Sequence, residues 1–263
     1  MQYDFILGLG RACSCSQTLR AAGLQLLSLP FDWIGWAYER DLPYRAELLC
    51  DDFTDWIRKE DLAFIRSEGP LDRYLDRRTQ TMIYHDFPKG VPFDEQYPRV
   101  IAKYERRIKR MYRLIESSKR VLLVRIDRPC SAPGTPLEDC RDAWHRISAR
   151  FPNVKFDFCL MAFEAGRSLE DRKVETLEEG FTRITLDYHD YSPGSIATSP
   201  NLDVSAAAMR ALYSVCEYRT ADEIRQKDEK KMQARWARYG AHNAFQYRIR
   251  KLKADILKRF SRA

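Results

Sequence analysis

The sequence has no long apolar run, and this absence is the first constraint on the chain. No segment approaches the roughly 18 consecutive apolar residues that a membrane-spanning helix requires. The N-terminal residues Met1 to Asp4 also lack the basic start and apolar stretch of a signal peptide. We therefore expect a cytoplasmic protein. The C-terminal segment discussed below is the part of the chain that could attach it peripherally to the inner membrane.

Cysteine pairs at metal-binding or disulfide-scaffold spacing are absent as well. The seven cysteines are scattered and odd in number, and no two are spaced as Cys-x-x-Cys. Cys13 and Cys15 alone cannot complete a four-ligand zinc site. We expect no metal and no disulfide framework, and we expect most of the cysteines to be small buried hydrophobic residues.

Positive charge is concentrated at one end of the chain. The chain of 263 residues is 44% hydrophobic, enough for a substantial core, and carries a net charge of +7. From Arg219 to Ala263 there are fourteen Lys or Arg and five Asp or Glu, so this segment holds the entire positive excess. We predict an α/β catalytic domain at residues 1–218 and a basic amphipathic helical tail at 219–263. The tail either binds an anionic membrane surface or packs its apolar side on the body, and nucleic acid is not expected because no binding motif accompanies the charge.

Alternating apolar runs and amphipathic segments predict an α/β fold. The arrangement is typical of a mostly parallel sheet with helices on both faces, in a Rossmann-like or esterase-like three-layer order. Residues 36–80 are expected to be mixed, mostly helical or irregular. The expected strands are 3–9, 24–29, 81–84, 120–127, 154–161 and 181–186, and the expected helices are 14–22, 98–115, a segment through Trp144, and 169–177.

Ligands of such sheets bind beyond the carboxyl ends of the strands. Polar residues are predicted in that position in the turn from Gly10 to Cys13, at His85 and Asp86, and at Arg125 to Arg128, with a fourth group at residues 187–190. The predicted gathering of these polar residues at the strand ends favours an enzyme.

Cys13 is the leading candidate for chemistry. It is predicted at the N-terminus of the first helix, where the helix dipole and free backbone N–H groups favour a thiolate. The same N–H groups can donate hydrogen bonds to a carbonyl oxygen and so stabilise the negative charge that develops on it under attack. Gly10, Arg11 and Ser14 beside it are candidate substrate contacts. The alternative is that Cys13 only fills the turn.

His85 is the preferred general base. It follows a short predicted strand, and either Asp32 or the adjacent Asp86 is available to orient its ring. His189, after the last predicted strand, is a second candidate base that the sequence does not rank decisively. The other interpretation of His85 is a surface histidine in a turn.

Two further patterns leave alternatives open. Arg125 and Asp127 either bind a phosphate, carboxylate or acidic sugar, or form a structural ion-pair cluster. Gly8-x-Gly10-x-x-Cys13, with Asp32 about 20 residues on, also resembles a dinucleotide fingerprint in which Cys replaces the third glycine, which is weak support for a nucleotide enzyme.

Several ordered blocks carry a resemblance to a family. They are Leu9-Gly10-Arg11-Ala12-Cys13, Leu27-Ser28-Leu29-Pro30-Phe31-Asp32-Trp33, Tyr84-His85-Asp86-Phe87, residues 104–110 and residues 121–125. Together they resemble a bacterial family of unknown function catalogued as papain-like cysteine peptidases, over roughly residues 3–190. The resemblance implies Cys13 as nucleophile, His85 as its partner and Asp32 as the orienting acid.

The chain departs from papain around the nucleophile, where Cys13-Ser14-Cys15-Ser16-Gln17 stands in place of Cys-Gly-[Ser/Ala]-Cys-[Trp/Tyr]. A nucleophile at a strand-to-helix turn looks more like an esterase or acyltransferase scaffold. In setting, the family is also similar to enzymes that acylate capsular or lipopolysaccharide sugars.

The leading hypothesis is an acyl-transfer enzyme with a thioester intermediate. A sugar hydroxyl as acceptor makes it an acyltransferase for a cell-surface polysaccharide, with acyl-CoA as a candidate donor and no tightly bound cofactor; water as acceptor makes it a cysteine hydrolase. The alternative is a non-catalytic nucleotide- or acidic-glycan-binding module of a membrane-associated assembly. The remaining predicted substrate contacts are Trp33, Asp86, Arg125, Asp127 and His189.

Overall fold

The computed structural model describes residues 1–11, 13–37, 40–127, 134–164, 172–187, 200–229 and 231. The chain divides into two compact units, residues 1–216 and 217–263. Residues 217–229 of the second unit are helical, and the rest of the predicted amphipathic tail lies almost entirely outside the described residues. Every helix in the described part of the chain is too short or too polar to cross a lipid bilayer.

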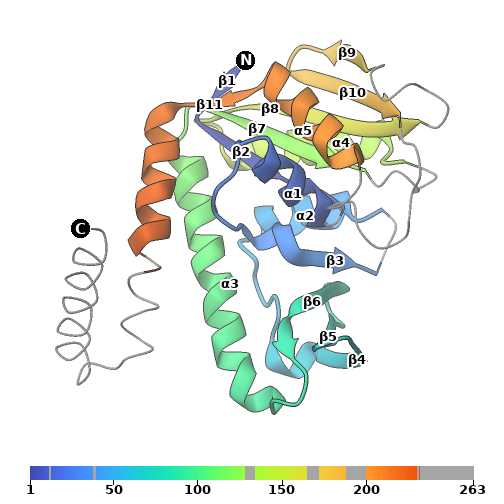
Figure 1. Cartoon of the computed structure of the whole chain (residues 1–263), viewed down its shortest axis with the longest axis vertical. Coiled ribbons are helices and arrows are strands. Elements are labelled where there is room, and N and C mark those ends of the chain that lie inside the picture. Colours follow the sequence, from blue (N-terminus) through green and yellow to red (C-terminus); the bar gives the residue numbers. More distant parts are fainter. Residues whose placement is uncertain are drawn as a thin grey trace, which may run out of the picture. The chain divides into compact units, whose positions relative to one another are not determined.

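The main sheet of the first unit has five strands in the order β2-β7-β8-β10-β9 (Figure 1). The first four are parallel, and β9 pairs antiparallel with β10. The parallel strands follow chain order across the sheet, so the order never reverses within the described strands. Their bounds are β2 (Phe5–Gly8), β7 (Arg120–Ile126), β8 (Lys155–Glu164), β9 (Lys173–Glu178) and β10 (Phe181–Asp187).

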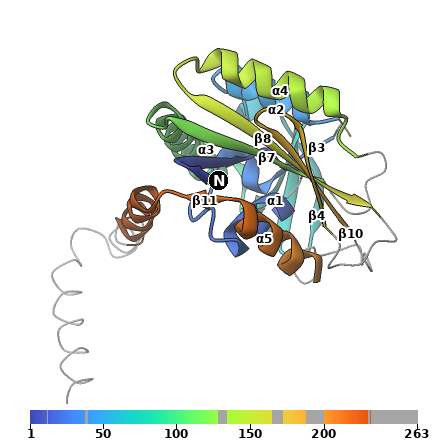
Figure 2. The same cartoon turned by 90° about the horizontal axis from the view of Figure 1, so that it is seen from above.

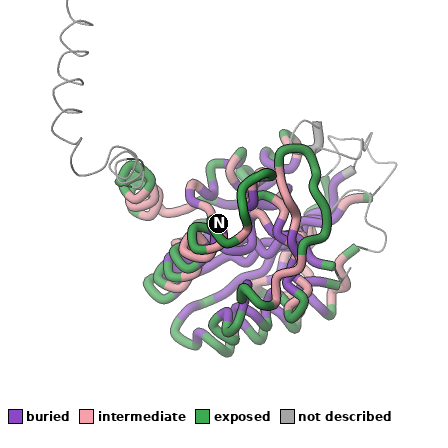
Figure 3. The backbone as a smooth tube through the Cα atoms, turned by 90° about the horizontal axis from the view of Figure 1, so that it is seen from below, coloured by how far each residue is buried: buried purple, intermediate pink, exposed green. Residues whose placement is uncertain are grey.

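Helices lie on both faces of this sheet because its strands are apolar on both sides. Phe5 and Leu7 of β2 belong to one buried cluster, shared with α2, α3 and α4, whereas Ile6 belongs to another, shared with α1 and α5. Figure 2 shows α2 and α4 on one side of β7 and β8, with α1 and α5 on the other. Figure 3 shows the strands between them as buried. The helices are α1 (Cys13–Ala21), α2 (Leu42–Cys50), α3 (Phe93–Glu116), α4 (Leu137–Arg150) and α5 (Pro200–Leu212).

The prediction of a mixed α/β fold is confirmed, but a separate antiparallel sheet was missed. Its four strands have the order β3-β6-β5-β4. The hairpin between β4 and β5 turns at Gly69, whose φ of 57° suits glycine, followed by Pro70. Residues 36–80 are mixed, as expected, but the strands β4 and β5 within them were not predicted. The strands are β3 (Ile34–Trp36), β4 (Leu62–Glu68), β5 (Leu71–Asp76) and β6 (Thr81–Pro88), joined by the 3-10 turns η1 (Pro30–Trp33) and η2 (Lys59–Asp61).

Two other predicted elements are wrong. The expected strand at 24–29 is irregular, because its carbonyl groups accept hydrogen bonds from side chains instead of from a neighbouring strand: Arg20 donates to Leu26, Gln25 to Leu27 and Arg110 to Ser28. The expected helix at 169–177 overlaps β9, which forms an edge strand of the main sheet. A further small sheet pairs β1 (Gln2–Tyr3) with β11 (Ser214–Val215) in parallel.

The contact between β2 and α1 requires glycine at position 10. A Cβ atom at Gly10 would lie 1.9 Å from Cys15 Cβ and 2.7 Å from Cys15 Sγ. The second glycine of the apparent dinucleotide motif thus lets the first turn of α1 approach the end of β2.

We expect Gly10→Ala to lower the free energy of unfolding by about 3 kcal/mol or more, at the upper end of overpacking costs, because the backbone must move to admit the methyl group. Chemical denaturation measures the loss. Cys15→Gly removes the clashing Cβ, so the double variant should recover part of the stability relative to Gly10→Ala. A double variant as unstable as the sum of the two single changes would contradict this explanation.

Candidate active site

Cys13 is the first residue of α1, directly beyond the end of strand β2. Its backbone N–H group is among those that a helix leaves without intrahelical partners, so it lies at the positive end of the helix dipole. The residue is half-buried, and its thiol has no hydrogen bond to any residue that the structure describes. The predicted position of Cys13, at the junction of strand and helix, is confirmed.

The other described cysteines are placed less favourably for nucleophilic attack. Burial raises the pKa of Cys15, Cys140 and Cys159 to about 12, and it also raises the pKa of Cys50. These thiols stay protonated at neutral pH, whereas only the thiolate attacks carbonyl carbon efficiently. Cys216 Sγ lies 3.4 Å from a carboxylate oxygen of Asp4.

The two neighbours of Cys13 on α1 face inward. Cys15 packs against Gly10 and its Sγ lies 3.7 Å from the carbonyl oxygen of Val124. Ser14 is buried, and its hydroxyl has no hydrogen-bond partner among the described residues. Ser14 therefore does not face an open surface in this conformation.

Asp32 lies in η1, beside α1. Its Oδ2 accepts hydrogen bonds from Gln25 Nε2 and the Leu29 backbone N–H, both at 2.8 Å, and lies 3.6 Å from Arg20 Nη2. Burial raises the pKa of this carboxyl group, although the Leu29 hydrogen bond and the Arg20 charge oppose the shift. Among the described residues, the carboxylate makes no hydrogen bond to His85.

His85 lies in β6 of the antiparallel sheet, not at the carboxyl end of a parallel strand, so its predicted placement was wrong. The residue is exposed, and its ring meets the half-buried Trp33 of η1 edge-on, with 5.8 Å between ring centroids. Partial burial, followed by the charges of Arg73 and Lys103, lowers the pKa of His85 below its usual value. The imidazole is therefore neutral at pH 7 and able to accept a proton.

Asp86 follows His85 in β6, where the pairing of β6 with β5 is irregular. Its carboxylate accepts a hydrogen bond from Tyr104 Oη at 2.5 Å and forms an ion pair with Lys103, both on α3. These contacts attach β6 to α3. They account for Asp86 without a bond to His85.

A chain of contacts links α1 to His85. Ser28 Oγ accepts hydrogen bonds from Arg20 of α1, at 3.1 Å, and from Trp33, at 3.4 Å, and Trp33 in turn contacts His85. These contacts therefore connect α1 to η1 and η1 to β6 in space. Between the thiol of Cys13 and the imidazole of His85 it records no hydrogen bond, and catalytic hydrogen bonds in unliganded enzymes often tighten only when substrate binds.

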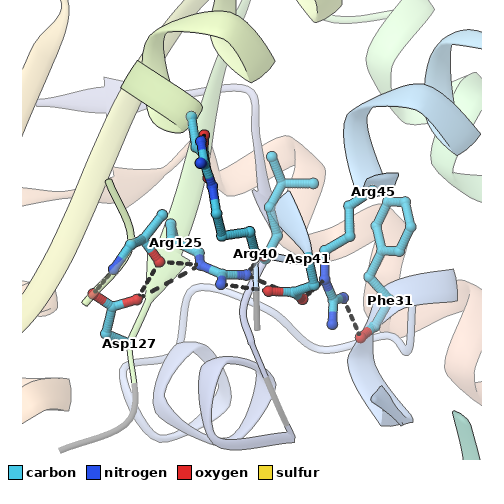
Figure 4. Close-up of polar contacts among 9 residues, drawn as sticks. Phe31, Arg40, Asp41, Arg45, Arg125 and Asp127 are labelled. Carbon is cyan, nitrogen blue, oxygen red and sulfur yellow. Dashed lines mark hydrogen bonds and ion pairs between the residues drawn. The ribbon is translucent and has the colours of Figure 1, made fainter. Parts of the chain in front are cut away.

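Arg125 and Asp127 form a structural cluster under the strand ends. Arg125 is 1% exposed, and its guanidinium donates to the Leu9 carbonyl at 2.9 Å, to Asp41 Oδ1 at 2.6 Å and to Thr135 Oγ1 at 2.9 Å (Figure 4). Asp127 accepts the backbone N–H of Thr135 at 2.9 Å and a hydrogen bond from its hydroxyl. All three guanidinium nitrogens of Arg125 are thus bonded within the protein.

Asp41 joins Arg125 to a second buried arginine, Arg45 of α2. Arg45 Nε donates to Asp41 Oδ2 at 2.6 Å, and its guanidinium lies 5.0 Å from the ring centroid of Trp36 (Figure 4). Burial alone would raise the pKa of Asp41, but the two guanidinium groups hold it below its ordinary value. Asp41 was not predicted as a site residue; its spacing of four from Arg45 at the start of a helix is the only local signal, and nothing local pairs it with Arg125.

His189 and Arg128 lie outside the described residues. Within the described part of the chain, no group of three or more His, Cys, Asp or Glu side chains could hold a metal ion.

Comparisons with known proteins identify a family and one distant relative. Residues 4–166 match the family described as "Putative papain-like cysteine peptidase (DUF1796)". The relative is "Uncharacterized protein R408" of Acanthamoeba polyphaga mimivirus, which is 23% identical over 171 residues, 59% of this chain and 76% of the viral protein. No solved structure matches the chain.

We expect Asp41→Asn to lower the free energy of unfolding by about 3–5 kcal/mol, because it leaves Arg45 buried without its countercharge and Arg125 with only Asp127, 3.7 Å away. Urea denaturation measures the change. Asp52→Asn is the matched control: it removes the carboxylate from an exposed pair with Arg150, and should cost about 1 kcal/mol or less. Equal losses of unfolding free energy in the two variants would show that the buried carboxylate stabilises the protein no more than the exposed one does.

Proposed function

Because the chain belongs to the family described as "Putative papain-like cysteine peptidase (DUF1796)", we propose that it is a cysteine hydrolase in which Cys13 is the nucleophile and His85 the general base. The observation that carries the proposal is the position of Cys13 at the first residue of α1, half-buried and without a hydrogen bond to any described residue. Burial raises the pKa of four other cysteines, and the thiol of Cys216 lies against Asp4, which leaves Cys13 as the best nucleophile among the cysteines that the structure describes.

The reaction proceeds in two steps. His85 takes the thiol proton of Cys13, and the sulfur attacks the carbonyl carbon of an amide or ester. The bond to the leaving group breaks, the leaving amine or alcohol receives the proton from His85, and a thioester remains on Cys13. His85 then deprotonates a water molecule that attacks the thioester, releasing the acid and restoring the thiol.

The backbone N–H groups at the start of α1 are the proposed oxyanion site. They have no intrahelical acceptors, and they point beyond the end of β2, where the attacked carbonyl oxygen becomes negative. Asp32 contributes by holding η1, which carries Trp33 against His85. We therefore treat Asp32 as a positioning residue for the loop.

A hydrolase and an acyltransferase differ in the group that accepts the acyl group from Cys13, which is water in the first and a sugar hydroxyl in the second. Family membership supports hydrolysis, and transfer to a sugar hydroxyl from a donor such as acyl-CoA uses the same thioester on Cys13. Incubation with a thioester donor, with and without a polysaccharide acceptor, distinguishes the two outcomes by the product formed. Free acid in both reactions supports the hydrolase.

The pairing of Cys13 with His85 can be tested directly with 1,3-dibromoacetone, which bridges a thiol and a nearby imidazole. We expect an intramolecular adduct between Cys13 and His85, identified by mass spectrometry of the digested protein. Cys50→Ser is the control and should form the same adduct, while His85→Ala should form only the adduct on Cys13. A bridge to His189 would assign the base to that residue instead.

The pH dependence of Cys13 alkylation tests the role of His85. The base works only when neutral, and its pKa is lowered by partial burial and by the Arg73 and Lys103 charges. The alkylation rate should therefore rise with pH at values below the ordinary histidine pKa of about 6.5. Arg73→Gln removes one of these charges, so the rise should move to higher pH.

Arg66→Gln is the control for that shift, since Arg66 lies on β4 in an exposed pair with Glu68 and does not contribute to the pKa of His85. An unchanged profile in Arg73→Gln would exclude His85 as the titrating group.

A further inference from the structure

A small pocket opens beside the nucleophile turn, at the carboxyl ends of β2 and β7. Its volume is about 60 Å³, room for one small polar group and too little for a large side chain. Its lining is rich in arginine and comes from four segments of the chain: Arg11, Arg40, Leu42, Arg125, Gly134, Thr135, Pro136 and Asp139.

Two of the three arginines in this lining are already neutralised. Arg125 is bonded to Asp41 and lies 3.7 Å from Asp127. Arg40 forms an ion pair with Asp139 and with the exposed Glu138. Their positive charges are therefore balanced by carboxylates of the protein.

Arg11 is different. It is half-buried, and it has no ion pair or hydrogen bond with any residue that the structure describes. Holding an arginine partly out of water without a carboxylate is unfavourable, and a guanidinium offers a planar fork of donors suited to an oxyanion. Its Cα is also within about 7 Å of the Cα of Cys13, since only one residue separates them.

We propose that Arg11 and this pocket form the subsite for an anionic group of the substrate, a carboxylate or a phosphate, adjacent to the bond that Cys13 attacks. This rests on the proposed function, and it specifies the substrate class: acyl compounds or peptides with a negative group next to the scissile carbonyl. Arg11 is the specificity-determining residue, and the network of Arg125 forms the floor of the subsite.

The test compares two alkylating reagents that differ in one group. Iodoacetate carries a carboxylate and iodoacetamide a neutral amide, and both form a bond to Cys13 Sγ with loss of iodide. The ratio of their rates at Cys13, followed by mass spectrometry, reports the anion preference. Arg11→Gln should lower this ratio about tenfold, whereas Arg11→Lys, which retains the charge, should lower it much less.

Two controls separate the subsite from the general positive charge of the protein. Arg66→Gln removes an arginine far from the pocket lining and should leave the ratio unchanged. The ratio at Cys50, close to Arg146 and Arg150, should not respond to Arg11→Gln. A ratio at Cys13 that is equal in wild type and Arg11→Gln overturns the proposal.

A second measurement does not depend on Cys13. Phenylglyoxal modifies accessible arginines, and we expect inorganic phosphate or succinate to protect Arg11 from it; the more protective anion identifies the preferred group. If Cys13 proves unreactive to both alkylating reagents, the proposed hydrolase fails, and protection of Arg11 still decides whether an anion binds. Absence of protection by either anion rejects the subsite.

Discussion

The ion pair between Arg125 and Asp41 is the interaction on which the arrangement of the candidate site depends. Both side chains are 1% exposed, so each charge would be costly to bury without the other. Arg125 comes from β7, Asp41 precedes α2, and the same guanidinium also binds the carbonyl of Leu9 at the end of β2. One side chain therefore holds together the strand that leads to Cys13 and the segment that leads to α2.

The two candidate catalytic groups come from different sheets. Cys13 follows a strand of the parallel sheet, where the backbone N–H groups of a following helix are directed beyond the strand end. His85 lies on β6 of the antiparallel sheet, which is attached to the rest of the unit through Asp86 and α3 and through Trp33 and η1. The chemistry we propose depends on how the second sheet is held against the first, and hence on η1, Asp32 and α3.

Charge explains why the surroundings of Cys13 suit an anionic substrate. The buried arginines of the network are balanced by Asp41 and Asp127, and Arg40 is balanced by Asp139. A buried charge with its countercharge is inert towards ligands, whereas Arg11 keeps donors for a group supplied from outside. We therefore assign a structural role to Arg125 and Arg40 and propose a ligand-binding role for Arg11, and only their partners distinguish them.

The sequence alone determined the parts that depend on local patterns. Apolar runs predicted β2, β7, β8 and β10, and the glycine turn after the first apolar run predicted Cys13 at the start of α1, because local spacing dictates periodicity and helix ends. Tertiary structure alone decided the rest: that the carbonyl groups of residues 26–28 accept hydrogen bonds from side chains, that residues 62–88 form an antiparallel sheet carrying His85, and that Arg125 pairs with Asp41, 84 residues away. These outcomes depend on which distant groups meet in the folded chain, and hydrogen bonds and ion pairs between distant segments leave no periodic trace in the sequence.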